Sequence, residues 1–250
     1  MESKAREIEE TMLAMRDEKR AQGMMRFFKT GPGEYGHDDH FLGIPNPGVR
    51  TLVKLSWKDV SLDEAAELVT NKWHEIRLCG LLIMVEHMLR ALKRRNYALA
   101  DSICERYLSL HPYINNWDLV DLSAIKIVGE WELLHPDNDL MDRWAELSDD
   151  CLWQRRIAMV ACWRTLRQGD HETVCSRAAL MMDSRHDLLH KAAGWMLREL
   201  WKHGGEERVE MFLEANVCRM PSVMLSYTCE KMSPQQKEYW RELRKSPAGK

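Results

Sequence analysis

A carboxylate stands in an apolar helical pattern four residues after a tryptophan. Asp121 follows Trp117 by one helical turn, so the carboxylate and the indole share one face. The other neighbours on that face are the apolar residues Ala124, Ile125 and Val128. A carboxylate in such a place is costly unless it is paired, hydrogen-bonded or facing a cleft. Two interpretations stay open: an internal bridge to a neighbouring repeat, or a cleft-facing charge that stabilises a cation.

Two arginines and a second tryptophan are also out of place. Arg155 and Arg156 each share a helix face with apolar residues, so neither is expected to be fully solvated. One is expected to pair with an acid of the preceding repeat, and the other to bind a phosphate. Trp195 lies beside the apolar stripe of its helix, between Lys191 and Arg198. That position suits stacking on a sugar or base, or filling the groove to the next repeat.

The elements that must position these residues are helices. No proline occurs between Gly48 and His111 or between Asp137 and Met220, and the apolar residues recur at helical spacing. Amphipathic segments open at four points separated by 44, 36 and 36 residues: Trp73, Trp117, Trp153 and Leu189. A period near 40 residues is typical of HEAT-like or armadillo-like solenoids, which stack helix pairs into a curved array. The sequence predicts an all-α solenoid, a single domain over residues 1–250, with an irregular helical bundle as the alternative.

A glycine-rich segment over residues 29–40 interrupts the N-terminal helices and predicts a loop or a short hairpin. Its run from His37 to His40 has metal-ligating residue types, but four adjacent residues cannot all face one ion without an awkward backbone. We therefore favour a solvated loop. Residues 245–250 are predicted to be frayed.

The composition narrows the class of protein. The net charge is −3, whereas nucleic-acid-binding domains are usually strongly basic. A local basic face is still compatible with this total. The chain has no apolar run long enough for a membrane helix and no secretory h-region. The seven cysteines are scattered, without a C-x-x-C pair, which argues against a disulfide framework and a structural zinc site. We expect a cytoplasmic protein.

Several motifs carry a family resemblance. The runs Asn115–Asp121, Leu152–Arg155 and Lys191–Glu199, with Phe41–Ile44 before Pro47 and Arg50, resemble the AlkD family of HEAT-like-repeat DNA glycosylases, in the family's order. The resemblance covers roughly residues 20–235. It implies release of N3- or N7-alkylated purines from duplex DNA held on a concave face.

The resemblance also implies roles for individual residues. It places Asp121, Trp117, Trp195 and Arg155 at the catalytic site. We expect a local basic surface for DNA from five residues: Arg156, Lys191, Arg198, Arg94 and Arg95. No metal or redox cofactor is expected, and the protein should act as a monomer. Two alternatives remain: a non-catalytic binder of branched or damaged DNA, to which a hairpin at the glycine-rich segment would point, and a protein–protein scaffold.

Overall fold

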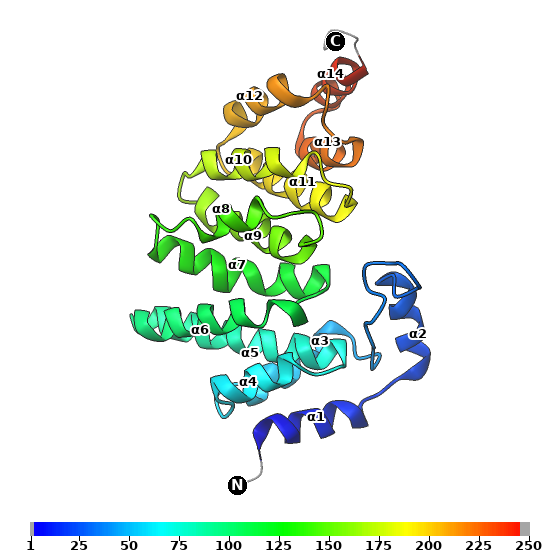
Figure 1. Ribbon diagram of the computed structural model, residues 1–250, viewed down its shortest axis with the longest axis vertical. Coiled ribbons are helices and arrows are strands. Elements are labelled where there is room, and N and C mark those ends of the chain that lie inside the picture. Colours follow the sequence, from blue (N-terminus) through cyan, green and yellow to red (C-terminus); the bar gives the residue numbers. More distant parts are fainter. Residues whose placement is uncertain (1–2, 246–250) are drawn as a thin grey trace. The chain divides into compact units, whose positions relative to one another are not determined.

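The computed structural model describes residues 3–245. Within that range the chain forms fourteen α-helices, two short 3-10 helices and no strand, which confirms the all-α prediction. The chain divides into two compact units, with the border inside one helix at Ile127 and Val128. Each unit is a stack of helices, as Figure 1 shows.

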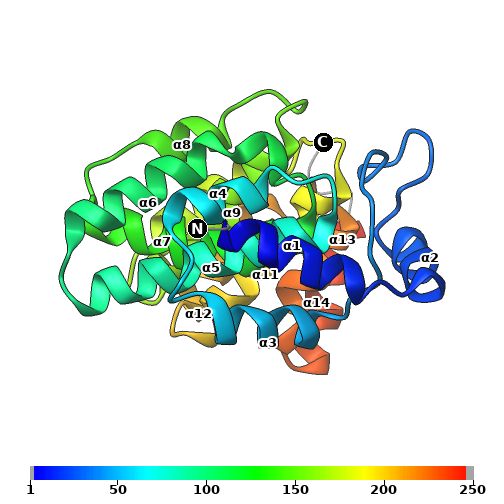
Figure 2. The same cartoon turned by 90° about the horizontal axis from the view of Figure 1, so that it is seen from below.

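Unit 1 contains six whole helices and the first half of a seventh. They are α1 (Lys4–Ala14), α2 (Glu18–Phe27), α3 (Asn46–Ser56), α4 (Leu62–Val69), α5 (His74–Lys93), α6 (Tyr97–Ser109), the 3-10 turn η1 (His111–Tyr113) and α7 (Trp117–Leu134). The long helix α5 is buried along most of its length and packs against α3, α4 and α6. Helices α4 and α6 also touch each other, so pairs of helices form two adjoining rows. Figure 2 shows this unit along the stack.

Close helix approach in unit 1 depends on Gly80. A side-chain carbon at this position of α5 would lie 2.6 Å from the carbonyl oxygen of Ala65 on α4. The start of α4 is fixed by a capping box, in which Ser61 and Glu64 satisfy each other's backbone N–H groups. Small residues and caps of this kind bring α4 and α5 into register.

Unit 2 continues the same pattern from residue 128. It contains α8 (Leu140–Ala145), α9 (Leu152–Leu166), α10 (His171–Met181), α11 (Asp187–Lys202), α12 (Glu206–Asn216), α13 (Ser222–Thr228), the turn η2 (Cys229–Lys231) and α14 (Pro234–Lys245). Helices α9, α11 and α13 pack in one row, while α8, α10 and α12 pack in a second row. Two such rows are what stacked helix pairs produce.

The predicted repeat points coincide with observed helix starts. Trp73, Trp117, Trp153 and Leu189 lie at or within two residues of the first residues of α5, α7, α9 and α11. The helical-repeat prediction is therefore confirmed within each unit. The curvature and the concave face stay predictions. The sequence predicts a single domain, whereas the contacts define two compact units joined through α7.

The segment between α2 and α3 is a loop of turns. The prediction of a loop is confirmed, but no hairpin forms in residues 29–40, where the single ladder contact is an isolated bridge from His40 to Trp73. Helix α14 extends to Lys245, and the rest of the predicted frayed tail lies outside the described residues. None of the described helices is long and apolar enough to cross a membrane.

Candidate functional site

A cavity of about 310 Å³ lies in unit 1 beside the first turns of α7. Trp117 and Asp121 both line it, so the structure brings these two predicted residues together. Most of the remaining wall is apolar. It comes from α2, α5, α7 and the loop before α3, and consists of Met24, Phe28, Ile44, Leu78 and Leu122. A carboxylate in such surroundings favours a cationic ligand over a neutral or anionic one.

The start of α7 sets the positions of both side chains. Asn116 is fully buried, and its side-chain oxygen accepts a hydrogen bond of 2.8 Å from the backbone N–H of Trp117. Asp121 follows one turn later and is half-buried. Its carboxylate is therefore carried by a helix whose first turn is held from inside the protein.

A buried ionic network lies directly behind the cavity. His74 is 1% exposed, and its two ring nitrogens lie 2.7 Å from Asp39 and 2.9 Å from Asp118. Because both nitrogens face carboxylate oxygens, both must donate and the ring is an imidazolium. Arg77 donates to the other oxygen of Asp39, and Asn116 donates to Asp39 at 2.8 Å. The two carboxylates and the two cations balance each other's charge.

The pKa values agree with this assignment. Burial alone lowers the pKa of His74, but the charges and hydrogen bonds of Asp118 and Asp39 outweigh it and raise the pKa to about 9. Burial acts to raise the pKa of Asp39, yet its bonds to His74, Arg77 and Asn116 hold that pKa below its usual value. The network is thus ionised around neutral pH.

A second set of hydrogen bonds, beside the network, anchors the loop before α3. The carboxylate of Glu75 accepts hydrogen bonds from three successive backbone N–H groups, Leu42 at 2.8 Å, Gly43 at 2.8 Å and Ile44 at 3.1 Å. The adjacent backbone N–H of His74 donates to the carbonyl of His40 at 2.8 Å. The loop is thereby fixed to the first turn of α5.

Aromatic rings connect the loop to α7. Phe28 stacks on Trp117 with ring centres 5.2 Å apart, and on Phe41 at 4.9 Å. Phe41 in turn stacks on the His74 ring at 4.4 Å, where a cation faces an aromatic surface. Trp117 is therefore held in one orientation by contacts that reach back to the ionic network.

The predicted solvated loop needs a correction at one residue. His37, Asp38 and His40 are exposed, as expected, but Asp39 is only 2% exposed and forms the centre of the buried network. The alternation follows from the turns of the segment, which direct Asp39 inward and its neighbours outward. Among the described residues, no group of three or more His, Cys, Asp or Glu side chains is arranged to hold a metal ion.

In unit 2, the structure places Arg155 inside the protein. It is 6% exposed, and its guanidinium donates to Asp149 at 2.6 Å and to the carbonyls of Ala145 and Leu180. The expectation that one of the two arginines pairs with an acid fits Arg155. These bonds hold α9 to its neighbours, and the catalytic role of Arg155 stays a prediction.

The neighbouring Arg156 is also buried. It is 4% exposed and donates to the carbonyl of Leu188, and its contact with a phosphate stays a prediction. The apolar neighbours of Arg156 on α9 already indicated that its side chain would be buried between helices.

The three remaining predicted residues of unit 2 lie along α11. Trp195 and Lys191 are half-buried. Arg198 is engaged by Glu199 at 3.4 Å and by Glu230, so much of its charge is already balanced within unit 2. A cavity of about 370 Å³ in unit 2 is lined by Glu230 and by cations of α14. The sequence analysis did not single out these cations, which include Lys237, Arg241 and Arg244.

In unit 1, the predicted basic pair separates. Arg94 lines a large cavity at the end of α5, whereas Arg95 does not line it and has a positive φ of 55°. The sequence analysis also missed His74, Asp39 and Phe28. The sequence offered one signal for His74: three polar residues, His74, Glu75 and Arg77, open a helix that is otherwise largely apolar. All three are buried in the structure.

The fold and the cavity together define a helical-repeat protein with a carboxylate and an indole set in an apolar wall. Residues 8–232 match the family of DNA alkylation repair enzymes, and the chain belongs to that family. Its fold is similar to that of a predicted DNA alkylation repair enzyme from Enterococcus faecalis. The two are 17% identical, with a TM-score of 0.63 over 88% of this chain and 97% of that chain. No curated protein matches the chain.

Proposed function

We propose that this protein is a DNA glycosylase that hydrolyses the N-glycosidic bond of N3- or N7-alkylated purines in duplex DNA. Family membership makes DNA its partner and alkylation repair its general task. The observation that carries the finer proposal is the cavity in which Asp121 and Trp117 face the same apolar space. This pairing of a carboxylate with an indole suits a cationic substrate.

The chemistry follows from the charge of the lesion. Alkylation at N3 or N7 makes the purine cationic and therefore a good leaving group. As the bond breaks, positive charge develops on the deoxyribose. A carboxylate fixed in a low-dielectric wall stabilises that charge and orients the attacking water, and the Trp117 face adds roughly 0.5–2 kcal/mol. The mechanism calls for no metal or redox cofactor, because the leaving group is already activated.

The ionic network supports this chemistry from behind the cavity. Asp118 also lines the cavity, but its charge is engaged by His74 at 2.9 Å. Glu75 is engaged by three backbone N–H groups. Asp121 lines the cavity one helical turn from Trp117, so we assign the charge-stabilising role to Asp121. Trp195 and Lys191 remain proposed DNA contacts of unit 2.

The experiment compares the two aspartates of the same helix. Asp121→Asn keeps the shape and removes the charge, and single-turnover release of 7-methylguanine should fall by about 10²–10³. Asp118→Asn should instead lower the thermal midpoint, because it removes a carboxylate from buried His74. Binding of undamaged duplex by Asp121→Asn should stay the same or tighten.

Three outcomes would contradict the assignment. Normal excision by Asp121→Asn would remove Asp121 from the catalytic role. A loss of excision that merely follows a loss of folded protein would make Asp121 an internal bridge. Wild-type protein that binds alkylated duplex without releasing a base would establish the non-catalytic DNA-binding alternative. The hairpin that would have favoured branched DNA is absent from residues 29–40.

We also propose that the protein acts as a monomer in the cytoplasm. All seven cysteines are thiols outside any disulfide, and five of them are buried. Thiols without disulfide partners are usual in a reducing compartment. The oligomeric state is measured by light scattering during gel filtration.

A further inference from the structure

Three cavities of unit 1 follow one face of α5. Leu78 lines the Asp121 cavity, Leu82 and Val85 line a second cavity of about 120 Å³, and Leu89 lines a third of about 640 Å³. Because these residues are three or four positions apart, they lie on successive turns of the same helix face. The second and third cavities also share Glu86 and Trp57.

The two flanking helices show the same progression. On α3, Asn46 lines the first cavity, Arg50 the second, and Trp57 at its end the second and third. On α7, Leu122 lines the first and Lys126 the second. We define the strand track as this row of three cavities. From Leu78 to Arg94 it extends about 24 Å along α5, at about 1.5 Å per residue.

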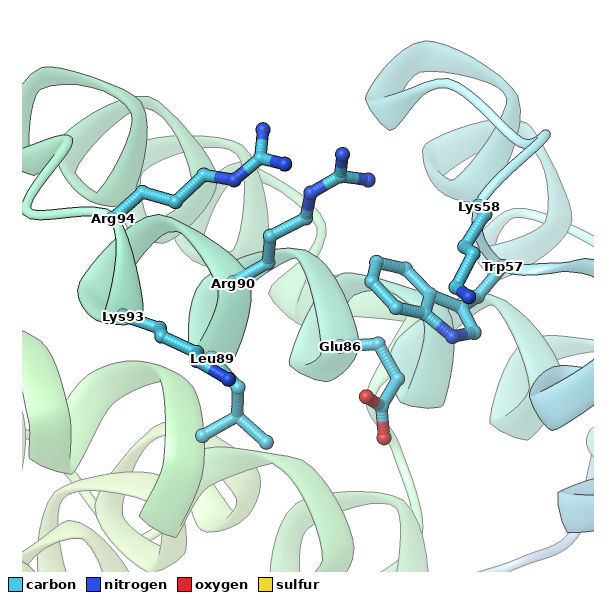
Figure 3. Close-up of a pocket in the computed structure, with 7 residues that line it drawn as sticks. All are labelled: Trp57, Lys58, Glu86, Leu89, Arg90, Lys93 and Arg94. Carbon is cyan, nitrogen blue, oxygen red and sulfur yellow. The ribbon is translucent and has the colours of Figure 1, made fainter.

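The strand track becomes basic as it leaves the Asp121 cavity. The middle cavity has three cations, Arg50, Lys54 and Lys126. The third has four, Lys58, Arg90, Lys93 and Arg94, against one carboxylate, Glu86 (Figure 3). Across residues 3–245, none of these seven cations forms an ion pair. Elsewhere on this acidic protein many arginines are paired, so this cluster is set apart.

Trp57 gives the third cavity an aromatic surface. It is half-buried at the end of α3, with the Arg90 guanidinium 5.6 Å from its ring centre and His87 against its edge at 5.8 Å. Figure 3 shows Trp57 and Lys58 facing the arginines of α5 across the cavity. The indole is thus held in place from the protein side while part of it lines the open space.

A row of cations that ends at an aromatic platform fits one ligand chemistry best. Phosphates of a nucleic-acid strand match successive cations, and an unpaired base stacks on an indole, as in proteins that bind single strands. A paired duplex keeps its bases stacked on each other and would leave Trp57 unused. The platform therefore favours an unpaired strand over a second length of duplex.

We propose that the strand track binds an unpaired DNA strand that leaves the duplex near the Asp121 cavity, with phosphates on the cations and a base on Trp57. The proposal rests on DNA as the partner and does not depend on catalysis by Asp121. It places the protein at alkylated bases beside gaps, forks or flaps. The glycine-rich loop takes no part.

The experiment measures fluorescence anisotropy with the full chain and three labelled DNAs. They are dT12, a blunt 12-base-pair duplex, and the same duplex with a dT12 arm. The armed duplex should bind at least tenfold tighter than the blunt duplex. Arg94→Glu should remove most of that advantage, and the double variant Arg90→Ala/Arg94→Ala should lower the salt slope for dT12 by about 1.4, at about 0.7 per phosphate contact.

A neighbouring residue provides the matched control. Arg95→Glu makes the same change of charge one position away, outside the cavity, and should retain the advantage of the arm. Trp57→Ala should weaken binding of dT12 and the armed duplex but not of the blunt duplex. Since Trp57 is half-buried, the thermal midpoint of the Trp57→Ala variant is measured as well. If that variant unfolds, the comparison at exposed Arg94 still decides the test.

Two results would overturn the proposal. Equal losses from Arg94→Glu and Arg95→Glu would indicate a diffuse positive field, and equal binding of blunt and armed duplex would assign the track to paired DNA. Excision of 7-methylguanine from blunt duplex is measured with the same variants. If the wild-type protein prefers the armed duplex but releases no base, the proposed glycosylase activity is refuted and the strand track stands. If it releases the base but does not prefer the armed duplex, the strand track is refuted and the glycosylase activity stands.

Discussion

Replacing Asp39 with asparagine should destabilise the protein far more than the same change one residue earlier. All three side chains around Asp39 donate to it: His74 at 2.7 Å, Asn116 at 2.8 Å, and Arg77. An asparagine offers one acceptor oxygen and an NH₂ group that only donates, so its NH₂ group must face a donor. The variant also leaves two buried cations with one carboxylate fewer.

The size of the effect follows from the burial of the partners. Asp39 is 2% exposed, His74 1% and Arg77 5%. Breaking a buried ionic arrangement by removing one partner costs about 3–5 kcal/mol in unfolding free energy. For a chain of this length that corresponds to a fall of roughly 10 °C in thermal midpoint. Asp38→Asn, at a side chain that is 91% exposed, should change the unfolding free energy by about 0.5 kcal/mol or less.

The assay is thermal and urea unfolding followed by circular dichroism, at 0.1 M and 1 M NaCl. The difference between the Asp39 and Asp38 variants should persist at high salt, because solvent ions do not screen buried pairs well. Midpoints for Asp39→Asn within two degrees of Asp38→Asn would refute the network as described. A difference that vanishes at 1 M NaCl would show that Asp39 lies at the surface.

Three further predictions concern stability. Because His74 has a folded pKa of about 9 against an ordinary value of 6.5, its contribution to unfolding free energy should be complete below pH 6.5 and lost as pH rises to about 9. Gly43→Ala should lower stability by several kcal/mol, because Gly43 has a φ of 87° and the added carbon would lie 2.1 Å from the Asp17 carbonyl. Arg177→Met should cost about 3 kcal/mol or more, because it leaves buried Glu132 without its partner at 2.7 Å. All three are measured by urea unfolding.

Matched variants decide each of these cases. In Asp39→Asn the loss should still begin near pH 6.5 but should be smaller and end below pH 9, because one of the two carboxylates that raise the pKa of His74 is gone. An unchanged profile would assign the pH dependence to other groups. Gly33→Ala shares a positive φ of 77° but meets no atom within 4 Å, so it should cost much less than Gly43→Ala. Arg208→Met removes an arginine paired with the largely exposed Glu172, and a loss equal to that of Arg177→Met would contradict the role of burial.

The fold could be predicted from the sequence because helical periodicity repeats along the whole chain. The proline-free stretches, the four tryptophan- or leucine-led segments and their spacing depend on local physics, and each segment opens a helix of the structure. Trp117 and Asp121 could be placed together for the same reason, since one helical turn fixes their separation. Predictions of this kind need no knowledge of distant contacts.

The rest of the site depends on contacts between distant segments. Asp39 is 35 residues from His74 and 77 from Asn116, and nothing in its immediate surroundings distinguishes it from exposed Asp38. Arg155 and Arg156 were recognised as out of place, but the partners that bury them come from α8, α10 and α11. Spacing reveals that a polar residue needs a partner, whereas the packing of other helices determines which partner it finds.

The buried ionic network adds little stability, but its position gives it a role in orienting the site. A buried set of two carboxylates and two cations is no more stable than well-packed apolar side chains, so stability alone gives little reason for it. Its bonds, however, reach the loop at Asp39, helix α5 at His74 and Arg77, and the start of helix α7 at Asp118 and the preceding Asn116. Apolar residues would fill the same volume without fixing the angle between these three segments. Because Trp117 and Asp121 lie on the first turns of α7, directional bonds at Asn116 and Asp118 orient the indole and the carboxylate before any substrate arrives.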